Sequence, residues 1–353
     1  MKAVLVARDI APSNALWMIY QEVTKSNRAI VEYSIFVGNG KPIRETVDQI
    51  TAWVGRANVV LVGMSSSPEL SKEEIATCEA AKKFGIPYGF YADTFGCAVT
   101  RNWFDCVRAD ASFVFVLNEK EAGEARKVFP KAKVIASGNP TWDDFFCPRL
   151  TREESRAKLG IKDDETFILC PGGKSLAINM QHWGFVLETL ACMNERSGYE
   201  SRKWQTVFSR HPGDQSAPDA YAELVKFSDI PVRVVLPDEM KSSDMIPGMD
   251  LMISCCSTAE IEAVCQRKPV ISYIPHTGRV RMRTTMGDKW EPVEQEVVEA
   301  VIGGSIESMQ YVIDDLLDYN YLQGDQEKFY PKPREKGIAL RAIVRTLQEF
   351  AKK

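Results

Sequence analysis

Short apolar runs alternate with amphipathic stretches through the first third of the chain. The apolar runs cover residues 2–7, 30–37, 58–64, 87–91, 112–117 and 133–136. Runs of this length, separated by segments of helical periodicity, predict parallel strands joined by helices. Helix starts are indicated at Ser71-Lys72-Glu73-Glu74 and at Asn118-Glu119-Lys120-Glu121, where the first side chain can cap the helix and the fourth can reach back.

A second alternating set follows a break in the pattern at residues 137–141. It resumes with a further capping signal, Thr151-Arg152-Glu153-Glu154, and predicts strands at residues 166–170, 205–209, 231–235, 251–254 and 269–273. We therefore predict an α/β protein with two doubly wound, Rossmann-like domains, residues 1–148 and 149–331. Their ligands are expected at the carboxyl ends of the strands, in a cleft between two facing sheets.

Residues 332–353 form a third segment, for which a helix is predicted. Leu340, Ile343 and Leu347 lie on an apolar stripe that needs a partner surface. We expect this helix to cross back to the first domain.

Composition and charge exclude several classes of protein. The chain has 353 residues, of which 45% are hydrophobic and 26% charged, as in an ordinary soluble protein and unlike a disordered chain or a disulfide miniprotein. There are 17 basic and 17 acidic residues before Arg149, which leaves 27 basic and 31 acidic from there on, so neither half has the basic excess of a nucleic-acid-binding domain. No apolar run approaches the length of a membrane span and residues 1–7 predict a strand rather than a signal sequence, so a cytoplasmic location is expected.

Cysteine and histidine spacing gives no metal motif. The nine cysteines include no Cys-x-x-Cys pair, and His182, His211 and His276 are far apart in sequence. We therefore predict buried thiols, and neither disulfides nor a metal site.

The most informative stretch is residues 250–275, whose pattern is strand, small-residue turn, helix and strand. A helix that starts at Ser257-Thr258-Ala259 presents free backbone N–H groups to which a diphosphate can dock. Glu262, one turn further along, can accept hydrogen bonds from ribose hydroxyls. Ser257 and Glu260 equally fit a capping box, and Glu262 can be simply solvated, so spacing alone leaves both interpretations open.

At this point the sequence resembles a known family. Residues 257–263, followed by Lys268-Pro269-Val270-Ile271, resemble the nucleotide-diphosphate motif of lipid A disaccharide synthase and related GT-B glycosyltransferases, and more loosely the corresponding segment of non-hydrolysing UDP-N-acetylglucosamine 2-epimerases. Three more segments agree in order: residues 135–143 resemble the "GxPxxD" or "GNxxxD" signature, residues 169–175 the "LPGSR" loop, and residues 210–212 the His-Pro turn. The resemblance implies a GT-B fold, a UDP-sugar donor and no metal.

Two parts of the family pattern are missing. The carboxylate that follows the synthase's third strand is replaced by Ser65-Ser66-Ser67. The epimerase's His-Val-Glu-Ala-Gly pattern is absent around residues 91–96. The lipid acceptor and true epimerase activity are therefore not implied.

Other loops of the second domain offer groups for phosphate or sugar oxygens. The loop Gly172, Gly173, Lys174 and Ser175 supplies backbone N–H groups and an ammonium, although a plain turn with a solvated lysine has the same composition. Arg210 and His211 end a strand in the same manner, and either binding or a structural role fits them. Arginines at 279, 281 and 283 can clamp an anion or belong to a solvated loop.

An inverting glycosyl transfer also needs a group that takes the acceptor's proton. Asp93 is the first choice because it directly follows an apolar strand, with Asp9 and the Glu119/Glu121 pair as further candidates and His211 as the imidazole alternative. Asp93 can equally cap a helix that starts near Cys97.

These observations predict a metal-independent GT-B glycosyltransferase. It moves a hexosyl or N-acetylhexosaminyl group from a UDP-sugar to an unidentified hydroxyl acceptor, glycan or lipid-linked, and needs no cofactor. A UDP-sugar 2-epimerase or hydrolase, and a catalytically silent sugar-nucleotide-binding protein, remain alternatives. Peripheral membrane contact and the oligomeric state are left open.

Overall fold

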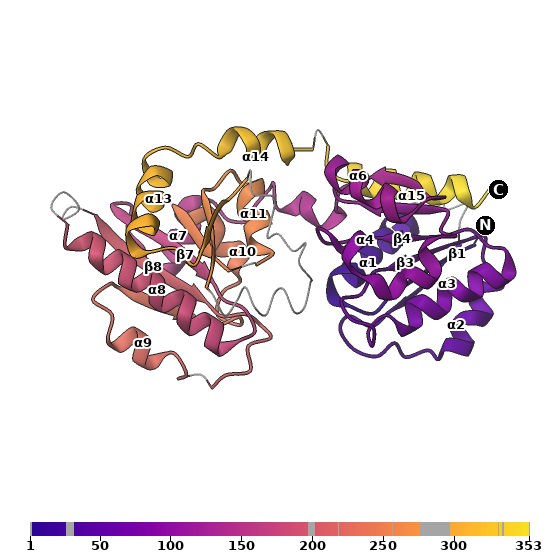
Figure 1. Ribbon diagram of the computed structural model, residues 1–353, viewed down its shortest axis with the longest axis horizontal. Helices are drawn as coiled ribbons and strands as arrows, with labels where there is room; N and C mark the ends of the chain where they lie inside the picture. The colour runs from indigo at the N-terminus through magenta and orange to yellow at the C-terminus, as the bar shows by residue number, and fades with distance from the viewer. Residues whose placement is uncertain are drawn as a thin grey trace. The chain divides into compact units, whose positions relative to one another are not determined.

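The structure, a computed structural model, describes residues 2–25, 32–196, 202–217, 219–255, 257–275, 297–330, 332–333 and 335–352. The chain divides into two compact parts: unit 1 is Met1–Asp143 with Pro333–Lys353, and unit 2 is Asp144–Lys332. Figure 1 labels the elements of both units. None of the helices in the described ranges is long and apolar enough to span a bilayer.

Unit 1 is built on six parallel strands in the order β2-β1-β3-β4-β5-β6. Their bounds are β1 Lys2–Ala7, β2 Glu32–Val37, β3 Val59–Gly63, β4 Tyr88–Tyr91, β5 Phe113–Val116 and β6 Lys133–Ala136. Successive residues of β1 enter two different apolar clusters, Val4 and Val6 on one face and Leu5 with its neighbours on the other. A sheet buried on both faces is the reason why these strands are continuous apolar runs.

Helices cover the two faces of this sheet. They are α1 Ile10–Lys25, α2 Val47–Val54, α3 Lys72–Phe84, α4 Cys97–Thr100, α5 Asp105–Arg108, α6 Glu119–Val128 and α15 Ile338–Phe350. The last of these, α15, belongs to unit 1, and its Leu340, Ile343 and Leu347 pack into the cluster that contains Leu16 of α1.

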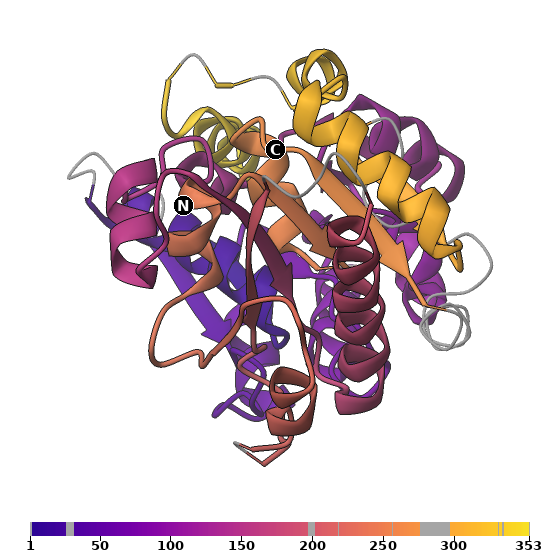
Figure 2. The same cartoon turned by 90° about the vertical axis from the view of Figure 1, so that its left-hand side faces the viewer.

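Unit 2 contains a second parallel sheet of six strands, in the order β12-β11-β10-β7-β8-β9. Its strands are β7 Glu165–Pro171, β8 Lys203–Ser209, β9 Val232–Val235, β10 Leu251–Ser254, β11 Val270–Ile274 and β12 Glu299–Ile302. Its helices are α7 Arg152–Leu159, α8 Leu176–Asn194, α9 Ala222–Lys226, α10 Ser242–Met245, α11 Ala259–Cys265, α13 Ile306–Asp318 and α14 Gln323–Phe329. Figure 2 shows α8 and α13 side by side over this sheet.

A group of aromatic rings lies within the core of unit 2. The ring of Trp183 on α8 stacks on Phe208 of β8 with centroids 4.5 Å apart, and Tyr221 lies 4.6 Å from the same ring. Stacked aromatic rings attract each other beyond the effect of the apolar area that they bury, so these pairs stabilise the packing of α8 against β8.

The predicted two-sheet α/β architecture is confirmed, and each predicted strand is present. Strand β12 was not predicted because a four-residue run that includes Glu299 carries too short a pattern to identify. The capping box at Thr151 and Glu154 is confirmed. The one predicted at Ser71 is wrong, because its hydroxyl donates to the carbonyls of Ser65 and Ser67 instead.

Candidate functional site

Three loops lie next to one another at the carboxyl edge of the unit 2 sheet. Each contains residues that the sequence predicts to bind a ligand. Strands β10, β7 and β8 are adjacent. The loop 172–175 follows β7, Arg210 and His211 follow β8, and Ser257 and Thr258 follow β10. The carboxyl ends of parallel strands are where ligands bind in such sheets.

The loop after β7 is closely packed at its first glycine and leads into a long helix. A Cβ atom on Gly172 would lie 2.7 Å from Trp183, so only glycine fits there. Ser175 is the N-cap of α8, yet its side chain makes no cap hydrogen bond. The first N–H groups of this 19-residue helix and the exposed Lys174 are therefore available to an anion at this edge.

A chain of buried polar side chains joins the loop after β7 to the loop after β8. Asn179 on α8 accepts from the N–H of Gly173 at 2.8 Å and donates to its carbonyl at 3.0 Å. It also donates to the hydroxyl of Tyr221 at 2.8 Å, and Tyr221 donates to Asp214 at 2.7 Å. Sequence reasoning missed Asn179, Asp214 and Tyr221, although an asparagine inside a helix, where it is a poor helix former, was a usable signal.

Arg210 directly follows β8, as predicted, and its guanidinium is hydrogen-bonded within its own loop. It is only 7% exposed, and its guanidinium donates to Asp214 at 3.3 Å and to the carbonyls of Ser216 at 2.8 Å and Ala217 at 3.3 Å. Its donors are thus used within the loop after β8. The structure gives Arg210 the role of holding this loop.

The tautomer of His211 is set by its own turn. The backbone N–H of Gly213 donates to Nδ1 of His211 at 2.8 Å, so Nδ1 carries no proton and the neutral ring carries it on Nε2. Burial, and then the charge of Lys174, hold the pKa of His211 below its ordinary value. A Cβ atom on Gly213 would touch both His211 and Lys174, at 3.1 Å and 3.3 Å, which shows that the two side chains lie together.

The turn after β10 forms half of the predicted capping box. The N–H of Ser257 donates to Glu260 at 3.3 Å, whereas the hydroxyl of Ser257 accepts from Ala259 at 3.2 Å and not from Glu260. Thr258, the residue before α11, is exposed. The small side chains of Ser257, Thr258 and Ala259 thus stand at the carboxyl edge, as predicted, at the start of a short helix.

Glu262 is buried, so the solvated alternative is wrong. Its exposed fraction is 9%. Burial, followed by the charge of Asp244, raises the pKa of Glu262 to about 7, against the opposing effect of Arg149. The arginines predicted at 279, 281 and 283 lie outside the described residues.

The carboxyl edge of the unit 1 sheet gathers acidic side chains. Strands β1, β3 and β4 are adjacent, and Asp9, Ser66 and Asp93 lie in the loops that follow them. Asp9 accepts from the hydroxyl of Ser66 at 2.5 Å and from its N–H at 3.2 Å. Burial raises the pKa of Asp9, but these hydrogen bonds outweigh it and leave the pKa below its ordinary value.

Asp93 does not cap α4. That helix has Gly96 as its N-cap, with no side-chain cap hydrogen bond. Asp93 is 6% exposed and accepts from Thr94 at 2.9 Å and from the guanidinium of Arg101 at 3.3 Å. Burial raises its pKa although Arg101 opposes the shift.

The other acidic candidates are used differently. Glu121 accepts from the N–H of Gly96 at 2.8 Å, and Glu119 pairs with Arg126 at 3.6 Å on the surface. Sequence reasoning treated Glu74 as part of a capping box. It is instead fully buried and accepts from the hydroxyl of Ser65 at 2.7 Å, and burial raises its pKa to about 7.

The cysteines in the described ranges form no disulfide. The described cysteines, Cys256 being outside them, are all free thiols, and four of them, Cys78, Cys97, Cys170 and Cys265, are buried. No group of three or more metal-ligating side chains occurs among the described residues.

The chain is similar to known proteins in structure, but its sequence matches no known family. No family model matches the chain, and no curated protein matches its sequence. The UDP-GlcNAc 2-epimerase from Neisseria meningitidis bound to UDP-GlcNAc is 16% identical over 99% of this chain and 100% of that chain, with a TM-score of 0.63. The S. aureus MnaA–UDP structure is 15% identical over 100% of this chain and 97% of that one, with a TM-score of 0.63.

A third similar structure is Anabaena Alr3699/HepE in complex with UDP-glucose. It is 13% identical over 99% of this chain and 100% of that chain, with a TM-score of 0.59. At these identities the similarity shows the fold. The predicted GT-B architecture of two Rossmann-like domains is therefore confirmed over nearly the whole chain, well beyond residues 135–275.

Proposed function

We propose that this protein is a GT-B enzyme that acts on a UDP-sugar and transfers its sugar to a hydroxyl acceptor without a metal ion. The observation that carries the proposal is the meeting of three loops at the carboxyl edge of β10, β7 and β8, with Lys174 beside His211 in front of the uncapped start of α8. Structures with the same fold contain UDP, UDP-glucose or UDP-GlcNAc, which favours uridine as the base.

The diphosphate is assigned to the loops after β7 and β8. The Lys174 ammonium and the first N–H groups of α8 attract negative charge, and Gly172 and Gly173 let the backbone come close. The Nε2–H of neutral His211 is a hydrogen-bond donor to the departing diphosphate, which gains charge as the glycosidic bond breaks. Arg210 positions these groups through its contacts in the loop.

The nucleoside is assigned to the segment after β10. The N–H groups of Ser257 and Ala259 shape this turn through their own hydrogen bonds, so exposed Thr258 is the residue that presents its backbone N–H. Glu262 accepts from the ribose hydroxyls in its ionised form. Since the pKa of Glu262 is about 7 in the free protein, ribose binding favours ionisation and releases protons near neutral pH.

Asp93 is assigned the role of the base that takes the proton of the acceptor hydroxyl. The acceptor oxygen attacks the anomeric carbon, the bond to UDP breaks, and the proton of the hydroxyl passes to the carboxylate. A pKa raised by burial makes Asp93 a stronger base than an exposed aspartate, and the contact with Arg101 fixes its orientation. Asp9 is the alternative base on the neighbouring loop.

A second candidate function is epimerisation or hydrolysis of the UDP-sugar. It is favoured by the similar structures that are UDP-GlcNAc 2-epimerases. Turnover of UDP-GlcNAc with no acceptor present distinguishes it from transfer. Normal UDP binding with no turnover, with or without a panel of acceptors, would instead indicate a silent binding protein.

The binding step is tested by calorimetry with UDP, GDP, CDP and ADP, each with and without magnesium. The proposal predicts selective binding of UDP that magnesium does not change, and an affinity that falls about tenfold or more in Glu262→Ala because the ribose loses its charged acceptor. Exposed Glu188 on α8 gives the control Glu188→Ala. Unchanged UDP affinity in Glu262→Ala would remove Glu262 from the site.

A further inference from the structure

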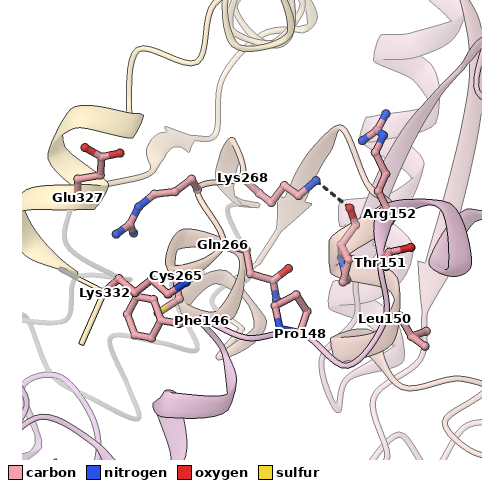
Figure 3. A pocket seen from close by; sticks show the side chains of 12 residues that line it. Phe146, Pro148, Leu150, Thr151, Arg152, Cys265, Gln266, Lys268, Glu327 and Lys332 are labelled. Atoms are coloured by element: carbon pink, nitrogen blue, oxygen red, sulfur yellow. Dashed lines mark hydrogen bonds between the residues drawn. The ribbon is translucent and has the colours of Figure 1, made fainter. Parts of the chain in front are cut away.

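A cavity lies in unit 2 at the opposite edge of the sheet from the proposed nucleotide site. Its volume is about 650 Å³. Lys268, which precedes β11, and Cys265, which ends α11, belong to its wall, so the cavity is at the amino ends of the strands. Figure 3 shows this wall together with Phe146, and with Glu327 on α14. A volume of this size suits a small molecule.

Two positively charged side chains in this wall are hydrogen-bonded to uncharged backbone carbonyls. The guanidinium of Arg267 donates to the carbonyls of Val264 at 3.0 Å and Tyr330 at 2.8 Å. The ammonium of Lys268 donates to the carbonyls of Pro247 at 2.8 Å, drawn in Figure 3, and Met249 at 3.0 Å. Carbonyl groups fix these two cations in place without neutralising them.

Acidic side chains do not balance this charge. Arg152, Arg267, Lys268 and Lys332 line the cavity, against Glu327 as the acid among the described lining residues. Asp250, outside the wall, pairs with Arg152 at 2.6 Å, and Lys332 has no hydrogen bond or ion pair to any residue in the described ranges. Asp250 also pairs with buried Arg156 at 3.3 Å, so it does not offset the charge of the wall. Four basic side chains against one carboxylate leave the lining with a net charge of +3.

The pKa of Lys268 is perturbed mainly by burial and next by a neighbouring positive charge. Burial, and then the nearby charge of Arg152, lower the pKa of Lys268 to about 8. An anion in the cavity would relieve this repulsion and raise the pKa of Lys268 again.

The remaining wall is apolar. Phe146 and Pro148 come from the segment that follows unit 1, and the guanidinium carbon of Arg267 lies 5.9 Å from the centre of the Phe146 ring. An aromatic ring next to fixed cations suits a ligand with a flat apolar body and a negatively charged head.

We propose that this cavity is a binding site for a small organic oxyanion, a phosphate monoester or a carboxylate carried on an apolar body. The site is separate from the proposed nucleotide site. Helix α11 connects the two, since Ala259 begins it at the carboxyl edge, Glu262 lies within it and Cys265 ends it at the cavity. The cavity also contains residues of both chain segments that join unit 2 to unit 1, at Phe146 and at Lys332.

The test is fluorine NMR of the full-length protein with two probes, para-fluorophenyl phosphate and para-fluorobenzoate. We expect saturable binding of at least one probe, weakened about tenfold or more in Lys332→Glu because the charge of an exposed wall residue is reversed. Lys158→Glu on α7 is the matched control, an exposed lysine of unit 2 outside the cavity, and is expected to bind like the wild type. The probe that binds more tightly identifies the head group as phosphate or carboxylate.

A third variant distinguishes binding of the probes in the cavity from binding at the carboxyl edge of the sheet. In Lys174→Ala the Lys332-dependent binding is expected to persist. Absence of saturable binding by both probes, equal weakening in Lys332→Glu and Lys158→Glu, or loss in Lys174→Ala with full retention in Lys332→Glu would each overturn the proposal. None of these results depends on whether the protein binds UDP.

Discussion

Asn179 holds Gly173 at both of its backbone polar groups, accepting from the N–H at 2.8 Å and donating to the carbonyl at 3.0 Å. A helix side chain therefore sets the shape of the loop after β7. Because the same amide donates to Tyr221, the loop after β8 depends on it as well.

The first prediction concerns this amide. Asn179→Ala is expected to lower UDP affinity about tenfold and to lower the free energy of unfolding by about 1–3 kcal/mol, since buried partners lose their hydrogen bonds. Asn194→Ala, at the other end of α8, is the control because Asn194 accepts from Trp204 at 2.8 Å far from the loop. Calorimetry with UDP and urea denaturation measure the two effects. Equal UDP affinities in the two variants would contradict a role of Asn179 in shaping the site.

The second prediction concerns His211. Its pKa lies below the ordinary value, and Nδ1 accepts from Gly213, so the ring is expected to be neutral with its proton on Nε2 at pH 7. Nitrogen NMR of the imidazole reports this tautomer directly. His211→Gln retains a donor near the Nε2 position and is expected to keep more of kcat than His211→Ala. A ring protonated on both nitrogens at pH 7 would refute the assignment.

The third prediction is a pH dependence of stability. The pKa of Glu262 is about 7 in the folded protein, above the ordinary value of 4.5, so its contribution to stability is fully present below pH 4.5 and is lost as pH rises through 7. Glu262→Gln avoids this loss and is expected to be more stable than the wild type at pH 8, by at most about 3 kcal/mol. Urea denaturation at pH 5 and pH 8 measures the difference, with Glu188→Gln as the control. A stability difference that does not grow with pH would mean that Glu262 is not a buried acid.

The fourth prediction concerns the base. Asp93→Asn is expected to lower kcat about a hundredfold or more while UDP affinity stays the same, because the residue acts on the acceptor's proton. Asp9→Asn tests the alternative on the neighbouring loop and is expected to have a smaller effect. Steady-state kinetics with an identified acceptor measure both variants. A larger loss of kcat in Asp9→Asn would transfer the role to Asp9.

Local patterns predicted the fold well, and they failed where long-range contacts decide. The box at Thr151 and Glu154 closes as predicted, whereas the same pattern at Ser71 does not. Glu74 instead accepts from Ser65, earlier in the loop that contains Ser71, and from the N–H of Arg8 in the loop after β1. Nothing in the residues around Glu74 indicates these contacts.

The candidate site, too, could be predicted only in part from the sequence. Loops that follow strands were predictable, because the ends of parallel strands meet at one edge of a sheet. The contact of Asn179 with Tyr221 was not, since it joins segments that are far apart in sequence. The contact of Tyr221 with Asp214 depends on how the loop after β8 closes. Burial of Glu262 follows from packing, which spacing alone does not give.

We propose that the carboxyl edge of β10, β7 and β8 binds UDP. The most direct test of this proposal is calorimetric titration of UDP, without magnesium, into the wild type, Lys174→Ala and the control Lys158→Ala. We predict saturable binding to the wild type, the same affinity in Lys158→Ala, and an affinity at least about tenfold lower in Lys174→Ala, because the ammonium no longer faces the diphosphate. Absence of UDP binding to the wild type, or equal affinities in all three proteins, would contradict the claim.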